Sequence, residues 1–313
     1  MTETDIGGNM PRPDVRRLLD YVNAAGPTEL DIEIVRKSQD AAVEQADLPM
    51  GDLATVRDLE MPGGIRARLF DPRESREPGP VVLWLHGGGF VWGGVESHQS
   101  LCAQAARELD LPVVLVEYRL APEAKFPAAQ DDAETAARWL AGNPAELGRE
   151  VRSLVLAGDS AGGLLTIVTA MALRDRPAAV GVDAHLVIYP VADESREYPS
   201  EREFAEGYLL TAAQRRWFRE QYQPVPDDVR ASPLLGDLTG LPPAVVMTAE
   251  LDPVRDHGRA YAAALVSAGV PTVFQEAKGI VHAFVLMRGA VPSARADVSA
   301  ALAALRGVTG TAA

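Results

Sequence analysis

A serine flanked by glycines stands where an apolar stretch gives way to a helical pattern. Residues 152–157 predict a short buried strand, and residues 161–173 predict a helix with an apolar face. Between them lies Gly158-x-Ser160-x-Gly162, a sharp strand-to-helix turn that needs small residues two positions away from the serine. Such a turn exposes Oγ of Ser160 and directs the free N–H groups of the helix start toward whatever the serine attacks. The chemistry indicated is nucleophilic attack, but the triplet arises by chance roughly 0.1 times in a chain of this composition. The other motifs of the chain must therefore decide whether Ser160 is a nucleophile.

Three consecutive glycines follow the apolar run 81–85, within His86-Gly87-Gly88-Gly89-Phe90. Glycine lets backbone N–H groups turn into a cleft with no side chain in the way. The N–H groups of residues 87–89, together with that of Ala161, can hold the oxyanion that forms when Ser160 attacks a carbonyl. The alternatives are a flexible loop or a phosphate cradle. A phosphate loop would need a lysine and a helix start directly after it, and neither follows here.

An acid that could orient a catalytic base follows a later apolar run. Asp252 stands in Glu250-Leu251-Asp252-Pro253, where the chain leaves the expected strand 244–249. An aspartate before proline is also a common turn former or helix cap. Asp256 is the rival acid, but it lies about one turn inside the helix expected over residues 255–268. We therefore favour Asp252.

The base is selected from five histidines. His282 lies in Gly279-Ile280-Val281-His282-Ala283-Phe284, after the expected strand 272–276, where a loop can carry it toward Ser160. A lone histidine is more often structural. The other four histidines have competing assignments. His86 is expected to hold the glycine loop and His98 to start a helix. His185 precedes an expected strand, and His257 lies inside an expected helix.

Other polar and aromatic residues near these motifs have two interpretations each. Asp159 neighbours the serine but is expected to be structural, because the turn aims only Ser160 into the cleft. Arg119 and Glu123 can contact substrate or belong to an ion-pair network that fixes their loop. Four residues can line an acyl or alcohol pocket or simply pack: Phe90, Trp92, Tyr208 and Leu209.

The pattern of elements predicts an α/β architecture. Two amphipathic helices over residues 13–25 and from about 28 to 45 come first, followed by a β-hairpin around Pro62-Gly63-Gly64. From Pro80 onward strands and helices alternate, which implies a parallel sheet covered by helices on both faces. The strands are expected at 81–85, 113–116, 153–157, 186–189, 244–248 and 272–276, and the helices at 98–109, 128–141, 161–174, 255–268 and 292–306.

The alternation stops between residues 191 and 235. This polar, proline-containing stretch has one helical pattern, at residues 211–222, and we interpret it as an insertion over the carboxyl ends of the strands. The expected division is N-terminal cap helices over 1–50, a first part of the core over 51–190, the cap insertion over 191–235 and a second part of the core over 236–313. Residues 1–9 are expected to be disordered.

Composition limits the classes of partner. The formal net charge of −14 argues against nucleic acid and anionic membrane surfaces. The single Cys102 excludes an internal disulfide and a zinc site built from several cysteines, and its helical surroundings predict a buried structural thiol. The first residues carry no apolar segment of a secretion signal, and no apolar run has the length of a membrane span. A cytoplasmic location is expected.

Several of these motifs together resemble the hormone-sensitive-lipase-like branch of the α/β-hydrolases, the bacterial carboxylesterases with an HGGG loop. The order Ser160, Asp252, His282 is that of the α/β-hydrolases. The resemblance runs from about residue 50 to the C-terminus, and the preceding helices stand where that family has cap helices. The matching motifs are residues 86–89, 118–123, 126–129 and 158–163, Asp252-Pro253, and Gly279-x-x-His282-x-Phe284.

The resemblance implies a serine carboxylesterase for short- to medium-chain acyl esters. It implies an α/β-hydrolase fold, with a mostly parallel central sheet, helices on both faces and a helical cap. Ser160, His282 and Asp252 would form a triad that works without metal or cofactor, on a small-molecule ester. A homodimer through the edge strand near 272–276 is also implied.

Other functions share this chemistry or this fold. An amide deacylase, a lactonase or a lipase would carry the same triad, although the charged stretch 191–235 disfavours the apolar lid of a lipase. A non-catalytic small-molecule receptor on the same fold is disfavoured by the complete set of Ser160, Asp252 and His282.

Overall fold

A single mixed sheet forms the centre of the molecule. The computed structural model describes residues 10–26 and 29–310, so the expectation for residues 1–9 falls outside the described part. The strand order is β1-β2-β4-β3-β5-β6-β7-β8. β2 runs antiparallel to β1 and β4, and every later neighbour pair is parallel. The strands are β1 Thr55–Met61, β2 Ile65–Asp71, β3 Gly79–Leu85, β4 Val113–Glu117, β5 Val151–Asp159, β6 Val182–Ile188, β7 Ala244–Leu251 and β8 Thr272–Val281.

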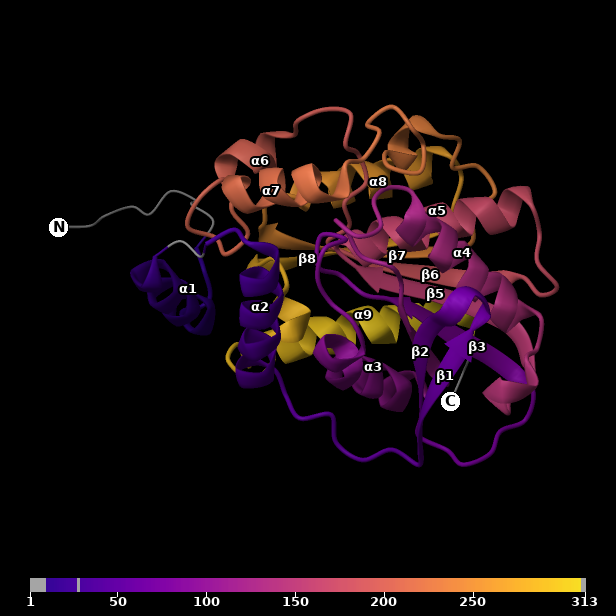
Figure 1. Ribbon diagram of the computed structural model, residues 1–313. Helices are drawn as coiled ribbons and strands as arrows, with labels where there is room; N and C mark the ends of the chain where they lie inside the picture. Colours follow the sequence, from indigo (N-terminus) through magenta and orange to yellow (C-terminus); the bar gives the residue numbers. More distant parts are fainter. Residues whose placement is uncertain (1–9, 27–28, 311–313) are drawn as a thin grey trace.

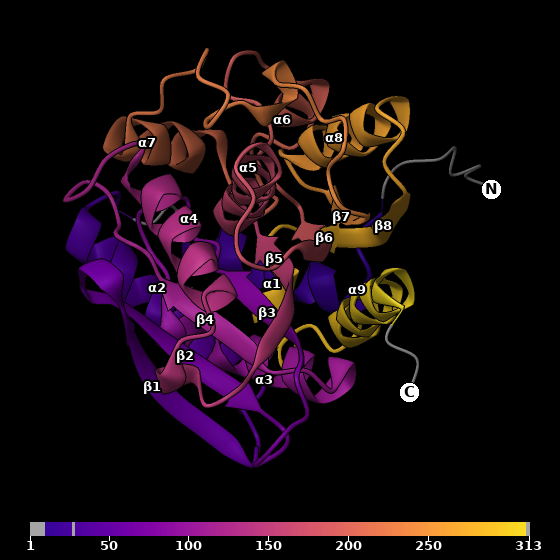
Figure 2. The same ribbon diagram turned by 90° about the vertical axis from the view of Figure 1, so that its right-hand side faces the viewer.

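Helices cover both faces of the sheet, as the alternating pattern predicts (Figures 1 and 2). Residues of α4, α5 and α8 share one apolar core with one face of the strands, and residues of α1, α3 and α9 share a second core with the other face. The helices are α1 Pro13–Ala25, α2 Ile32–Ala46, α3 Val95–Leu109, α4 Ala128–Ala141, α5 Ala161–Asp175, α6 Pro199–Glu203, α7 Ala212–Tyr222, α8 Arg255–Ser267 and α9 Ala294–Thr309. Short 3-10 turns occupy Pro62–Gly64, Ala145–Leu147, Pro233–Leu235 and Phe284–Leu286.

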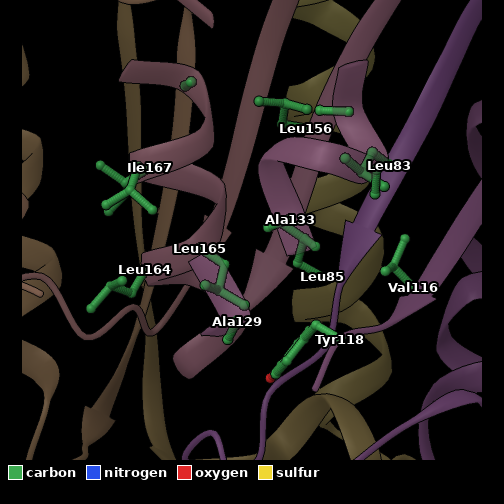
Figure 3. Packing of buried hydrophobic residues seen from close by; sticks show 14 of the residues in the cluster. Leu83, Leu85, Val116, Tyr118, Ala129, Ala133, Leu156, Leu164, Leu165 and Ile167 are labelled. Atoms are coloured by element: carbon green, nitrogen blue, oxygen red, sulfur yellow. The ribbon is translucent and has the colours of Figure 1, made fainter. Parts of the chain in front are cut away.

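The core on the α4 and α5 side is built from small helix residues against branched strand residues. Ala129 and Ala133 of α4 let that helix approach the sheet closely, and Leu164 and Leu165 of α5 fill the space beside it (Figure 3). Each is buried, and burial of a leucine side chain stabilises the fold by about 2 kcal/mol. This packing therefore holds β5, which ends one residue before Ser160, in a fixed position.

Several boundaries differ from those predicted, and one helix was not predicted. α3 begins at Val95, three residues before its expected start, and β6 begins at Val182, so His185 lies inside a strand rather than ahead of it. β8 continues to Val281 through Gly279, whose φ of +65° is accessible to glycine. The missed helix is α6, a single turn that begins at Pro199.

The N-terminal helices contact segment 191–235 and the loops that follow β3 and β4. The Asn23 side chain of α1 donates to the carbonyl of Gly207. Arg36 of α2 donates to the carbonyl of Val91, and it forms an ion pair with Glu123. Figure 1 shows α1 and α2 at one end of the sheet and α6 and α7 along its upper side. Within residues 10–26 and 29–310, no helix combines the length and the apolar character needed to cross a membrane.

Candidate active site

Ser160 occupies a strained turn between β5 and α5. Its φ of +54° and ψ of −117° place a residue with a side chain in a region that favours glycine. A Cβ on Gly158 would lie 2.3 Å from the carbonyl oxygen of Gly162, and one on Gly162 would lie 1.9 Å from that of Leu85. The two glycines of the predicted motif are therefore required by close backbone approach, and the turn rests directly on the end of β3.

Three side chains from three strand ends form a continuous line of hydrogen bonds. His282 Nε2 lies 2.9 Å from Ser160 Oγ, and His282 Nδ1 lies 2.6 Å from Asp252 Oδ2. The residues follow β5, β7 and β8, whose parallel arrangement brings their carboxyl ends to one edge of the sheet. All three are buried, and the second oxygen of Asp252 accepts the N–H of Val254. The arrangement can activate a serine hydroxyl as a nucleophile.

The rival acid and the other histidines lie elsewhere. Asp256 accepts the backbone N–H of Ser200 and pairs with Arg255, so it holds α6 against α8. His185 bonds Tyr261, and His257 bonds Glu201. His98 and His86 both lie beside the glycine loop. Within the described residues, His282 is the histidine bonded to Ser160.

The glycine loop turns sharply after β3. Gly88 and Gly89 have φ of +114° and +61°, which glycine adopts readily. The prediction for Gly87 needs correction, because its N–H points to the buried side chains of Asp159 and His98, at 3.2 and 3.3 Å. No acceptor among residues 10–26 and 29–310 bonds the N–H groups of Gly88, Gly89 and Ala161. These three groups stay available as donors.

The four residues predicted to line a pocket are engaged in packing. Phe90 stacks on Tyr222 with ring centroids 3.9 Å apart, and Trp92 Nε1 donates to Asp40 over 2.8 Å. Tyr208 and Leu209 are half-buried and pack on the second core, Tyr208 edge-on to Phe204.

Phe218 is a neighbour of the site that the sequence analysis does not single out. A Cβ on Gly89 would lie 2.7–2.9 Å from three atoms of the Phe218 ring, so the ring of this α7 residue covers the loop. The aromatic residues of segment 211–222 indicate an amphipathic helix. No sequence signal shows which of them faces the loop.

Arg119 and Glu123 form ion pairs with different partners. Arg119 pairs with Asp132 of α4, and Glu123 pairs with Arg36 of α2. Both pairs tie the loop after β4 to helices, as the ion-pair interpretation predicts. Cys102 is buried in α3, and burial raises the pKa of its thiol. This thiol is structural, as expected.

Comparisons with known proteins relate the whole chain to ester hydrolases. A model of the alpha/beta hydrolase fold family matches residues 82–286. An ethyl acetate hydrolase of Pseudomonas putida is 40% identical over 233 residues, 72% of this chain and 73% of that protein. Esterase LipI of Mycobacterium tuberculosis is 35% identical over 308 residues, 94% of each chain. A solved structure of the ester hydrolase EH1AB1, from the metagenome of Lake Arreo, has a TM-score of 0.91 at 38% identity and covers 96% of this chain and 100% of that one.

Proposed function

Because the chain belongs to the hormone-sensitive-lipase-like carboxylesterases of the alpha/beta hydrolase family, we propose that it hydrolyses short- to medium-chain acyl esters with Ser160 as nucleophile. Carboxylic ester hydrolysis is its activity. The observation that carries the proposal for Ser160 is the hydrogen-bonded line from Ser160 through His282 to Asp252. The proposed substrate is a small-molecule ester.

In the proposed first half-reaction, His282 Nε2 takes the proton of Ser160 Oγ as that oxygen attacks the ester carbonyl. Asp252 accepts the Nδ1–H of His282, fixes the ring orientation and stabilises the imidazolium. The negative oxygen of the tetrahedral intermediate accepts from the N–H groups of Gly88, Gly89 and Ala161, and each such donor contributes about 3 kcal/mol in comparable enzymes. The intermediate collapses, and the alcohol leaves with the proton held by His282.

The second half-reaction frees the serine. His282 takes a proton from a water molecule, whose oxygen attacks the acyl carbonyl of the Ser160 ester. The same donors stabilise the second oxyanion, and His282 returns the proton to Oγ as the acid leaves. The cycle uses only side chains, backbone N–H groups and water.

We further propose that α1, α2 and segment 191–235 act as a cap over this site. Phe218, which comes from that segment, covers Gly89, and α2 reaches the loop through Arg36. The proposed boundaries are those of the sequence analysis, with the core over 51–190 and 236–313. We also propose the cytoplasm as the location of the protein.

Hydrolysis of p-nitrophenyl esters from acetate to palmitate tests the proposed substrate class. An optimum between acetate and octanoate supports it, while an optimum at palmitate would identify a lipase. The same triad can cleave amides and lactones, so the panel includes a p-nitroanilide and a lactone. Turnover of those alone, with none of the esters, would contradict the proposal.

Phe218 is expected to limit acyl or alcohol length, because its ring fills the space over Gly89. Phe218→Ala should raise kcat/KM for decanoate relative to butyrate by at least about tenfold, the lower end of the effect of one methylene group in an apolar pocket. Tyr21→Ala, which removes an exposed ring on α1, is the control and should leave the ratio unchanged. An unchanged ratio in Phe218→Ala would show that the ring does not border the substrate.

A homodimer through β8 is also proposed. Among the described strands β8 pairs with β7 alone, so no described strand covers its other edge, where Arg12 bonds the carbonyls of Lys278 and Gly279. Phe274 on this strand is 43% exposed. Light scattering is expected to give twice the chain mass, and Phe274→Glu is expected to shift it toward a single chain. The mass of one chain for the wild type at micromolar concentration would contradict this.

A further inference from the structure

A buried carboxylate lies directly beneath the glycine loop. Asp159 is the last residue of β5 and is 2% exposed. β3 is its neighbour in the sheet, with Leu85 paired to Gly158, so Asp159 sits where β3 continues into the loop. Its Oδ1 accepts the N–H of Gly87 over 3.2 Å and the indole N–H of Trp84 over 3.4 Å.

His98 of α3 completes the surroundings of this carboxylate. Its Nε2 lies 3.3 Å from Asp159 Oδ1, and its Nδ1 lies 2.8 Å from the hydroxyl of Ser97. Burial by itself would raise the pKa of Asp159, but His98, His86 and the Trp84 N–H outweigh it and hold that pKa below its usual value. The carboxylate is therefore charged although it is buried, with the N–H groups of Gly87 and Trp84 directed at it and Nε2 of His98 beside it.

The loop and the carboxylate fit each other closely. A Cβ on Gly87 would lie 2.4 Å from Asp159 Oδ2, so only glycine lets the loop rest on the carboxylate. The carbonyl of Gly87 is held as well, 2.7 Å from Nδ1 of His86, whose ring stacks on Tyr118. The Tyr118 hydroxyl donates to the carbonyl of His86. Both polar groups of Gly87 are thus fixed, and the next free N–H groups along the chain are those of Gly88 and Gly89.

A charged carboxylate next to the nucleophile needs an explanation. The residue adjacent to Ser160 is negative, while the proposed reaction builds a further negative charge on the oxyanion nearby. Like charges oppose each other strongly where water is excluded. An apolar side chain would avoid this cost, but it could not accept the N–H of Gly87.

We propose that Asp159 and His98 are positioning residues of the oxyanion hole. The carboxylate captures the N–H of Gly87, and His98 holds the carboxylate in place, so that the N–H groups of Gly88 and Gly89 remain free for the oxyanion. This inference rests on the proposed function. It assigns no contact with substrate to either residue.

Replacing Asp159 tests the inference through binding of the transition state. Asp159→Ala removes the acceptor for Gly87, and kcat is expected to fall about 10²-fold with KM changed less than about threefold, since displaced donors lose the oxyanion and not the substrate. An alkyl trifluoromethyl ketone adds to the serine as a tetrahedral oxyanion, so its inhibition constant should rise by the same factor as kcat/KM falls. Asp159→Asn should recover part of the activity, because its amide oxygen can still accept the N–H of Gly87.

Two variants of His98 test the same inference if Asp159→Ala fails to fold. His98→Leu should reproduce the loss of kcat and of ketone affinity, and His98→Gln, whose side-chain amide can form hydrogen bonds in place of Nε2, should lose less. Tyr261→Phe is the matched control. It deletes a buried hydrogen bond to His185, so it should lower the midpoint of thermal unfolding and leave kcat unchanged.

Two results would overturn the inference. One is folded Asp159 and His98 variants with wild-type kcat and ketone affinity. The other is a fall in kcat without any loss of ketone affinity. Failure of the proposed function gives a different result, because the wild type would then hydrolyse no ester or Ser160→Ala would remain active.

Discussion

Replacing Asp252 with asparagine should reduce kcat for p-nitrophenyl butyrate by about 10³- to 10⁴-fold while KM changes little. The carboxylate accepts the Nδ1–H of His282 over 2.6 Å and is fully buried. An amide in its place cannot stabilise the imidazolium, and its NH₂ group favours the tautomer that leaves Nε2 protonated and unable to accept the serine proton. Steady-state kinetics over a range of pH measures the loss.

Asp256→Asn is the matched control, because Asp256 is the rival acid of the same sequence segment. It contacts Ser200 and Arg255 and has no hydrogen bond to His282 in the described structure. This variant should keep kcat close to that of the wild type. If Asp256→Asn lost activity and Asp252→Asn kept it, the acid would be wrongly assigned.

The second large effect is expected for Ser160. Ser160→Ala should lower kcat by at least about 10⁴-fold, because no other described hydroxyl lies within hydrogen-bond distance of His282 Nε2. The fold should remain stable, since the serine hydroxyl makes no other hydrogen bond among the described residues and alanine removes only one atom. The measurements are the hydrolysis rates of both proteins, with the wild type titrated for active sites, and their circular dichroism spectra.

Ser267→Ala, on the exposed surface of α8, controls for purification and for contaminating esterases. It should retain full activity. If Ser160→Ala were as active as the wild type, a different group or a contaminating esterase would perform the reaction.

The central sheet was predictable because the buried strands are continuous apolar runs bounded by glycine and proline. Residues 81–85, for example, fall within β3, and the hairpin around Pro62-Gly63-Gly64 pairs Met61 with Ile65. The extension of β8 through Gly279 was not predictable, because a glycine normally marks the end of a strand. α6 was missed because it is a single turn whose position depends on tertiary contacts, namely those of Ser200 with Pro253 and Asp256.

The proximity of Ser160, Asp252 and His282 could be inferred because each follows a parallel strand, and parallel strands end at one edge of a sheet. The direction of each N–H in the glycine loop could not. The N–H of Gly87 is occupied by Asp159 and His98, which come from β5 and α3 and are brought together by the fold. The position of Phe218 could not be predicted for the same reason. The face that α7 turns toward the glycine loop depends on how segment 191–235 packs.

The central claim is that Ser160 carries the acyl group during turnover. Wild-type protein mixed with excess p-nitrophenyl acetate and quenched in acid during steady state should, on peptide mass spectrometry, carry the mass of one acetyl group on the peptide that contains Ser160. Asp252→Asn should acetylate more slowly, and Ser160→Ala should carry no acetyl group there. Active protein that shows acetylation at another residue, or no covalent intermediate even when deacylation is made rate-limiting, would contradict the claim.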